Sequence, residues 1–304
     1  MSDERIGRRG QIKIYFGKCY RTFLHEKGWV CLISTVIISL ILGAVVGDKT
    51  FKLYEKTQYG VFAMICGCIW TGLFNSIQAI CKERAIIKRE HRTGLHISSY
   101  IFAHMLFDLC LCVVEGAIIT IVFDILREFP SSGVVFGLAG FEFFVGFTLI
   151  IFCSDALGIM VSCIVKSENA AMTVMPFVLI IQLVLSGLMF SLPENAEWIK
   201  DITISKWGLC SICSSADVDS LPSSEYNKMA EKIEDFDEYD VFDELSEEEK
   251  EEFLDSFASS GSSKFNFDAT PGHVVSTWFV LILYSFIYGL IGILFLRRVD
   301  KDKR

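Results

Sequence analysis

The chain has 304 residues, of which 52% are hydrophobic and only 21% are charged, and 26 of them are phenylalanine. With a mean hydropathy of +0.45, this composition excludes an ordinary soluble domain and indicates a polytopic membrane protein. The net charge of −9 is unevenly distributed: residues 217–268 carry 18 acidic and 4 basic side chains, a net of −14, which leaves +5 for the remainder.

Residues 11–27, QIKIYFGKCYRTFLHEK, have the pattern of an amphipathic helix. Ile12, Phe16, Cys19 and Phe23 recur at helical spacing, and the lysine and arginine side chains lie off that face. The pattern predicts a helix that lies on the surface of an anionic membrane leaflet. An ordinary juxtamembrane tail is the alternative.

Six apolar runs follow, at 29–46, 59–80, 99–123, 134–154, 169–190 and 274–296. Each is near or above the ~18–20 residues that a helix needs to cross the hydrocarbon core. The segments expected on one side of the membrane hold 18 Lys and Arg residues, and the two short loops on the other side hold 4. We therefore predict an all-α polytopic membrane protein with six transmembrane helices and both termini cytoplasmic.

A polar segment at 82–100, KERAIIKREHRTGLHISSY, separates the second and third apolar runs. Its five basic residues and the short apolar stripe at 85–87 predict a helix at the membrane surface. Gly94 suits the end of this helix, and Ser98 or Ser99 can cap the next one. Such a helix is well placed to receive force from a cytoplasmic partner. The alternative is a loop whose basic residues only follow the positive-inside rule.

Several ionisable and amide side chains lie inside the apolar runs, where they are costly and point to function. They are Asn75 in the second run, His104, Asp108 and Glu115 in the third, Glu142 in the fourth and Gln182 in the fifth. Two interpretations stay open. These groups line a polar translocation route, or they form interhelical hydrogen bonds that hold the bundle together.

Residues 191–273 form the long connection between the fifth and sixth runs, which we expect outside the membrane as a small loop domain. Trp198 and Trp207 suggest that residues 194–208 lie at the membrane interface. The acidic part predicts one or two short amphipathic helices and lacks the glycine and the spacing of an EF-hand. Cys210 and Cys213 are a candidate local disulfide if that side is oxidising.

Motifs for nucleotide binding and for hydrolysis are missing from the sequence. Residues 43–50, GAVVGDKT, approach a phosphate-binding loop, but the glycine spacing is wrong and Asp48 separates glycine from lysine. The patterns HExxH, GxSxG and paired CxxC are also missing. We therefore expect no catalytic residue, metal site or cofactor on this chain, and no nucleic-acid partner.

Short motifs follow one another in a fixed order over most of residues 11–300. Around the second and third runs they are FNS at 74–76, Glu83-Arg84, KREH at 88–91, Gly94 and Tyr100. Around the fifth run they are SENAA at 167–171, Pro176, SGL at 186–188, Trp198 and KWG at 206–208. In order and spacing, they resemble the membrane domain of type-2 ABC exporters, closest to the ABCG/White-like branch.

The resemblance implies a half-transporter that pairs, as a homodimer or heterodimer, around a central cavity in the lipid bilayer. Residues 11–27 would be the connecting helix, and residues 81–96 would hold the coupling helix that meets an ABC ATPase subunit. The implied coupling residues are Glu83, Arg84, Lys88, Arg89, Glu90 and Arg92. The implied substrate-cavity residues are Thr71, Asn75, Met175, Leu179 and Gln182.

White-type members carry an ATPase before this domain, whereas only about ten residues precede the connecting helix here. ATP and Mg²⁺ are therefore expected on a separate partner subunit, and the chain itself is not expected to be an enzyme. The expected parts are 1–28 (tail and connecting helix), 29–190 (spans one to five), 191–273 (extracellular loop with the acidic insertion) and 274–304 (sixth span and basic cytoplasmic tail).

The expected function is the permease subunit of an ABC exporter in the plasma membrane, which moves a lipid-like, amphipathic or peptide substrate outward. One alternative is an ATP-independent, proton-coupled carrier or channel that uses Glu115 or Glu142. Another is a membrane signalling or binding protein that acts through its acidic outer domain.

Overall fold

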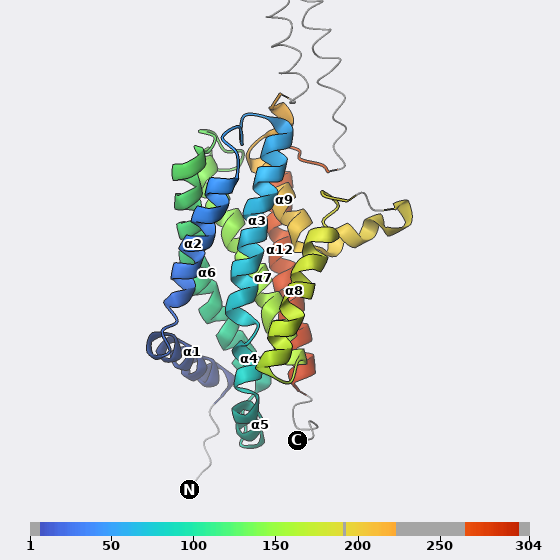
Figure 1. The fold of residues 1–304 in the computed structure, drawn as a ribbon. Helices are drawn as coiled ribbons and strands as arrows, with labels where there is room; N and C mark the ends of the chain where they lie inside the picture. Colours follow the sequence, from blue (N-terminus) through green and yellow to red (C-terminus); the bar gives the residue numbers. More distant parts are fainter. Residues whose placement is uncertain (1–6, 191–192, 223–264, 298–304) are drawn as a thin grey trace, which may run out of the picture.

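The computed structural model describes residues 7–190, 193–222 and 265–297, which form a bundle of helices without strands. Helix α1 (Arg8–His25) lies across one end of this bundle, and α5 lies at the same end (Figure 1). The further elements are α2 (Val30–Val45), α3 (Tyr54–Ser76), α4 (Ala79–Lys82), α5 (Arg84–Arg92), α6 (Ile97–Arg127), α7 (Ala139–Ile164), α8 (Glu168–Val184), η1 (Glu194–Ile202), α9 (Ile204–Ser215), η2 (Val218–Ser220) and α12 (Pro271–Leu296).

Four helical segments of the described chain are long and apolar enough to cross a membrane: α3 continued by α4, α6, α7 and α12. Helices α1 and α2 form a pair bent by 70°, which makes five candidates if the pair counts as one span. Helix α8, with 17 residues, is shorter. The prediction of an all-helical membrane protein is confirmed, whereas the count of six spans is not established by these helices.

Helix α7 lies at the centre of the bundle and packs against α3, α6, α9 and α12. Small residues bring α3 and α7 close together. A Cβ atom on Gly72 would lie 2.4 Å from the carbonyl oxygen of Ile151, and one on Gly158 would lie 2.1 Å from Oγ of Ser76. Because such residues let two backbones approach, they stabilise helix pairs inside a membrane.

Two predicted span boundaries are wrong. The fourth run was placed at 134–154, but α7 runs from Ala139 to Ile164 and continues through the buried Asp155. The residues before α7 form a loop whose backbone is bonded to Glu142 instead of to a helix. The fifth run was extended to 190, but α8 ends at Val184, and Gly187 adopts a positive φ of 83° in the turn that follows.

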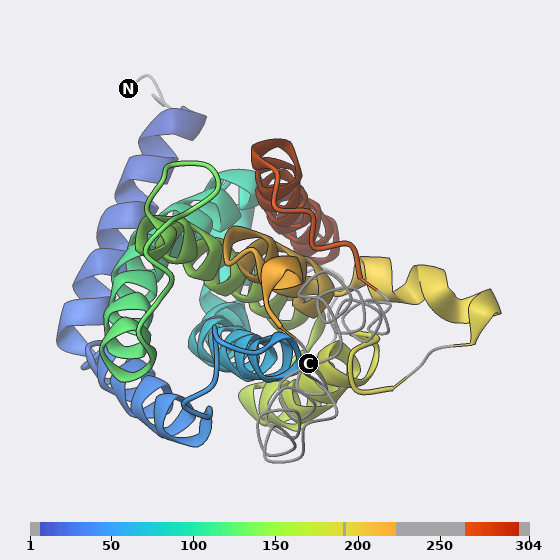
Figure 2. The same ribbon diagram turned by 90° about the horizontal axis from the view of Figure 1, so that it is seen from above.

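The region 191–273 also differs from a simple outer loop. Helix α9 packs among α3, α7 and α12, and Leu209, Ile212 and Cys213 on it are fully buried. Gly208 permits this position, because its missing side chain leaves room for Ile150 of α7. Element η1 projects sideways from the bundle (Figure 2). The predicted amphipathic helices of the acidic insertion and most of the basic tail fall at 223–264 and 298–304, outside the described residues.

Candidate functional site

One face of α1 is hydrogen-bonded to α5 and to the turn that follows it, in the connection between α3 and α6. The side-chain amide of Gln11 donates to the carbonyl oxygen of Gly94 at 3.1 Å and accepts from the backbone N–H of His96 at 2.9 Å. One turn further along, the hydroxyl of Tyr15 donates to the carboxylate of Glu90 at 2.9 Å. Because side chains four apart share a helix face, these contacts run along a single stripe of α1.

Glu83 is the centre of this junction, which we call the α1–α5 junction (α1, α4, Glu83 and α5). It stands at the break between α4 and α5, where the predicted helix at 81–96 divides in two. Its carboxylate accepts from Nζ of Lys18 at 2.6 Å and from the hydroxyl of Tyr100 at 2.8 Å. Burial by itself would raise the pKa of Glu83, but these two hydrogen bonds outweigh it and lower the pKa below its ordinary value.

Arg84 joins the junction to the centre of the bundle. Its guanidinium donates to the carbonyl oxygens of Cys163 and Val165, each at 2.9 Å. These carbonyls lie at the end of α7, where the helix leaves acceptors unsatisfied and where a cation is favoured by the helix dipole. The side chains of Glu83 and Arg84 thus connect the junction to α1, α6 and the end of α7.

The predicted coupling residues divide into two groups on α5. Glu83, Arg84 and Glu90 face inward and brace the chain itself, and Lys88 is half-buried. Arg89 and Arg92 are exposed. Ile86, which lies nearer the start of the same helix, is 41% exposed. We call Ile86, Arg89 and Arg92 the outer face of α5. Its mixture of an apolar and two cationic side chains suits contact with another protein.

The apolar stripe of α1 packs on α6 instead of facing lipid. Phe16 and Phe23 both make edge contacts with Phe107, with ring centroids 6.1 and 5.8 Å apart. Between them, Sγ of Cys19 lies 3.6 Å from Nδ1 of His104. The stripe was correctly read as apolar, but a neighbouring helix supplies the surface that covers it.

The polar groups inside the bundle form two separate clusters. In the first, Glu115 on α6 accepts from the amide of Asn75 on α3 at 2.8 Å and from the hydroxyl of Thr35 on α2 at 3.2 Å. One carboxylate therefore joins three helices. Glu142 acts differently, because its carboxylate accepts the backbone N–H groups of residues 134, 135 and 136 at 3.1, 2.6 and 2.8 Å. Both arrangements match the structural interpretation of these acids.

The second cluster pairs Asp108 on α6 with Asp155 on α7, which sequence reasoning missed. The two carboxyl groups lie next to each other, and Oδ2 of each is buried without a hydrogen-bond partner among the described residues. Asp155 was assigned to a loop because an acid usually ends an apolar run. The apolar residues that resume at 156–165 were the available signal.

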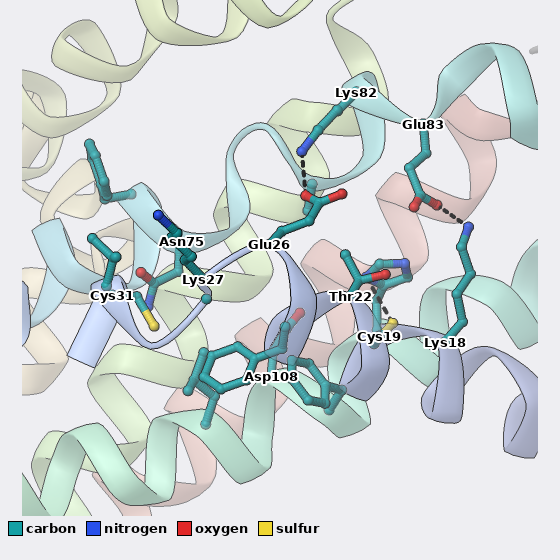
Figure 3. Close-up of a pocket in the computed structure, with 18 of the residues that line it drawn as sticks. Lys18, Cys19, Thr22, Glu26, Lys27, Cys31, Asn75, Lys82, Glu83 and Asp108 are labelled. Carbon is teal, nitrogen blue, oxygen red and sulfur yellow. Dashed lines mark hydrogen bonds and ion pairs between the residues drawn. The ribbon is translucent and has the colours of Figure 1, made fainter. Parts of the chain in front are cut away.

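The predicted cavity residues are not gathered around one pocket of this chain. Thr71, Met175 and Gln182 are buried, and Gln182 accepts from the backbone N–H of Ile204 at 2.9 Å. Leu179 is partly buried beside Met175. Of these residues, Asn75 lines the cavity between α1, α2, α3 and α6, and the other four do not line that cavity (Figure 3). A cavity formed between two copies stays a prediction.

Cys210 and Cys213 are both buried free thiols on α9. The other predicted groups lie as described above, His104 beside Cys19 and Asp108 beside Asp155. No group of three metal-ligating side chains occurs within the described part of the chain.

Residues 10–214, from α1 to the end of α9, match the family described as ABC-2 type transporter. The chain belongs to this family. The ABC transporter ATP-binding/permease protein Rv1747 of Mycobacterium tuberculosis is 28% identical to this ABC-2 protein over 161 residues, which are 51% of the chain and 18% of that relative. The chain thus spans less than a fifth of the relative's length.

Family membership makes this ABC-2 protein a multi-pass transmembrane component of an ABC transporter. It confirms the resemblance drawn from the order of the short motifs. The matched residues include the α1–α5 junction and the buried helix α9. The junction is thus part of the transport domain itself.

Proposed function

We propose that the chain is the permease subunit of an ABC exporter in the plasma membrane. It pairs with a second membrane subunit and with an ATP-binding subunit, and it moves a lipid-like, amphipathic or peptide substrate outward. The four long spans are completed by α2 and α8, which cross the membrane as short helices. Both termini are then cytoplasmic, in agreement with the distribution of 18 Lys and Arg residues on one side and 4 on the other.

The observation that carries this proposal is the division of α5 into a braced inner face and an exposed outer face. The outer face contacts the ATP-binding subunit. The inner face transmits the resulting motion through Glu83 to α1 and α6 and through Arg84 to α7. In this proposal ATP and Mg²⁺ bind to the ATP-binding subunit.

The decisive experiment reverses the charge of the outer face with Arg89→Glu and Arg92→Glu together. Both side chains are exposed but lie in the last turn of α5, where the helix dipole favours cations, so we expect the free energy of unfolding to fall by about 1–2 kcal/mol and the chain to stay folded. Co-purification with the ATP-binding subunit should be lost. The matched control is Lys13→Glu with Arg21→Glu on the exposed side of α1, which makes the same change in charge and should retain the partner. A double variant on α5 that retains the partner would contradict the proposal.

A proton-coupled carrier is the second candidate, because the bundle holds the unpartnered carboxyl oxygens of Glu115 and of the Asp108–Asp155 pair. The two candidates differ in their energy source. Reconstituted alone in liposomes, the chain should show no vectorial transport in a proton gradient if it is an ABC permease. Robust transport without any ATP-binding subunit would favour the carrier instead.

A further inference from the structure

A cavity of about 400 Å³ lies within a single subunit, between α1, α2, α3 and α6. It is separate from the predicted substrate residues on α8, none of which lines it. Exposed side chains surround its mouth, among them Glu26 and Lys27 at the bend between α1 and α2 and Lys82 at the end of α4 (Figure 3). With the orientation proposed above, this mouth opens at the cytoplasmic edge of the membrane.

The walls of the cavity are largely apolar. Phe23 comes from α1, Val30 from α2, Phe74 from α3, and Phe107 and Leu111 from α6. Phe107 is held in place by its edge contact with Phe23, with ring centroids 5.8 Å apart. Cavities of about 300–1,000 Å³ with such walls hold small apolar or amphipathic molecules. A volume at the low end of this range suits one alkyl chain better than a two-chain lipid.

The charged side chains of the lining largely neutralise one another. Lys82 is paired with Glu26 at 2.6 Å, and Lys18 is paired with Glu83 at 2.6 Å. Lys27 at the mouth and Asp108 in the interior belong to neither pair. No N–H or O–H group among the described residues donates to Oδ2 of Asp108, which is buried.

The carboxyl pair of Asp108 and Asp155 is short of hydrogen-bond donors. Oδ2 of Asp108 and Oδ2 of Asp155 are both buried without a hydrogen-bond donor among the described residues. An ionised carboxyl group only accepts, so neither one can satisfy the other. A buried acceptor without a donor is costly, and a cationic donor satisfies it best.

We propose that this cavity binds a single-chain amphiphile with a protonated amine, which places its ammonium group on Asp108 and its alkyl chain among Phe23, Phe74 and Phe107. The inference goes beyond the transport role, because the site is complete within one subunit. Anionic amphiphiles are repelled by the carboxyl pair. Neutral ones cannot replace the ammonium group as a charged donor.

The test uses the purified full chain in detergent and a twelve-carbon alkylamine with a photoreactive group at the end of its chain. Cross-linked peptides are mapped by mass spectrometry. We expect labelling on the peptides that contain Phe23, Phe74 and Phe107, and competition by dodecylamine but not by dodecyl sulfate or dodecanol. Labelling centred on residues 171–182, or equal competition by the sulfate, would overturn the proposal.

Three variants sharpen the test. Asp108→Asn removes the charge without changing the shape of the side chain and should lower labelling at least tenfold. Asp155→Ala removes the neighbouring carboxyl group without supplying a donor and leaves the cavity lining intact, so labelling should be retained. Leu111→Trp fills the cavity and should abolish labelling with Asp108 still present. Thermal unfolding confirms that each variant is folded, and labelling of Asp108→Asn equal to that of the wild type overturns the proposal.

The outcome is independent of the proposed function. If labelling fails but the ATP-binding subunit still co-purifies, the amine site is wrong and the permease role stands. If the amine labels the cavity but no ATP-binding subunit is retained, the permease role fails and the site stands.

Discussion

At the end of the bundle that carries α1 and α5, side-chain hydrogen bonds and ion pairs, such as those of Lys18 with Glu83 and of Tyr15 with Glu90, are added to a buried apolar cluster that includes Ile87. At the opposite end the helices are joined mainly by buried packing. There α9 is enclosed by α3, α7 and α12, and the rings of Phe51, Phe129 and Phe143 are in mutual contact at 4.6–5.6 Å.

The difference separates contacts that can rearrange at little cost from contacts that cannot. Half-exposed ion pairs contribute about 0–1 kcal/mol each, so the ion pairs of the junction can rearrange at little cost. A buried apolar side chain contributes about 1.5–3 kcal/mol, so the opposite end and the buried Ile87 of α5 resist rearrangement. Helix α5 therefore combines one anchored side with contacts that can change.

The largest effect is expected from Glu142→Ala at the packed end. The substitution leaves three backbone N–H groups without their acceptor, so the free energy of unfolding should fall by about 3 kcal/mol. Denaturant or thermal unfolding in detergent measures the change. The control is Glu168→Gln, an exposed acid in the first turn of α8, which should change stability by less than about 0.5 kcal/mol. Equal effects of the two substitutions would refute this account of Glu142.

A smaller effect is expected from Glu83→Gln at the α1–α5 junction. It weakens the bonds from Lys18 and Tyr100 together, so we expect a loss of about 1 kcal/mol in the free energy of unfolding. The increase in the partner's rate of ATP hydrolysis on addition of substrate should also become smaller. Glu26→Gln disrupts the more exposed pair with Lys82 and should cost less than about 0.5 kcal/mol. A loss at Glu83 as large as that at Glu142 would erase the contrast between the two ends.

The smallest effect is the dependence of this contribution on pH. The folded chain lowers the pKa of Glu83 below 4.5, so its ionised form stabilises the fold above the pKa of the unfolded chain. This contribution is lost as the pH falls through the lowered pKa. The difference in melting temperature between the wild type and Glu83→Gln should therefore be full at pH 7 and shrink below about pH 4.5. A difference that stays constant or grows on acidification would show that Glu83 does not act through its charge.

Residue patterns anticipated a large part of this molecule. Four of the six apolar runs coincide with helices of spanning length, and the polar segment after α3 does contain a surface helix. The apolar stripe of α1 was also recognised, from Phe16 to Phe23. These features depend on periodicity and hydropathy, which are local properties of the chain and can be read without knowledge of the fold.

The roles of the polar residues could not be read in the same way. Asp155 suggests a loop in isolation, and only the position of α6 shows that it faces Asp108 inside the bundle. Glu83 and Arg84 look like docking residues until their partners on α1, α6 and α7 are known. Each partner lies 17 to 81 residues away in the sequence, so no local pattern records it.

By itself, the sequence determined that this protein is a helical membrane component with a basic amphipathic helix between two spans, because hydropathy and charge act on each segment separately. Tertiary structure alone decided which charges brace the junction, which are exposed on α5, and which lie around the cavity beside Asp108. The physical reason is that a buried polar group takes its role from the donors and acceptors around it, and those come from other helices.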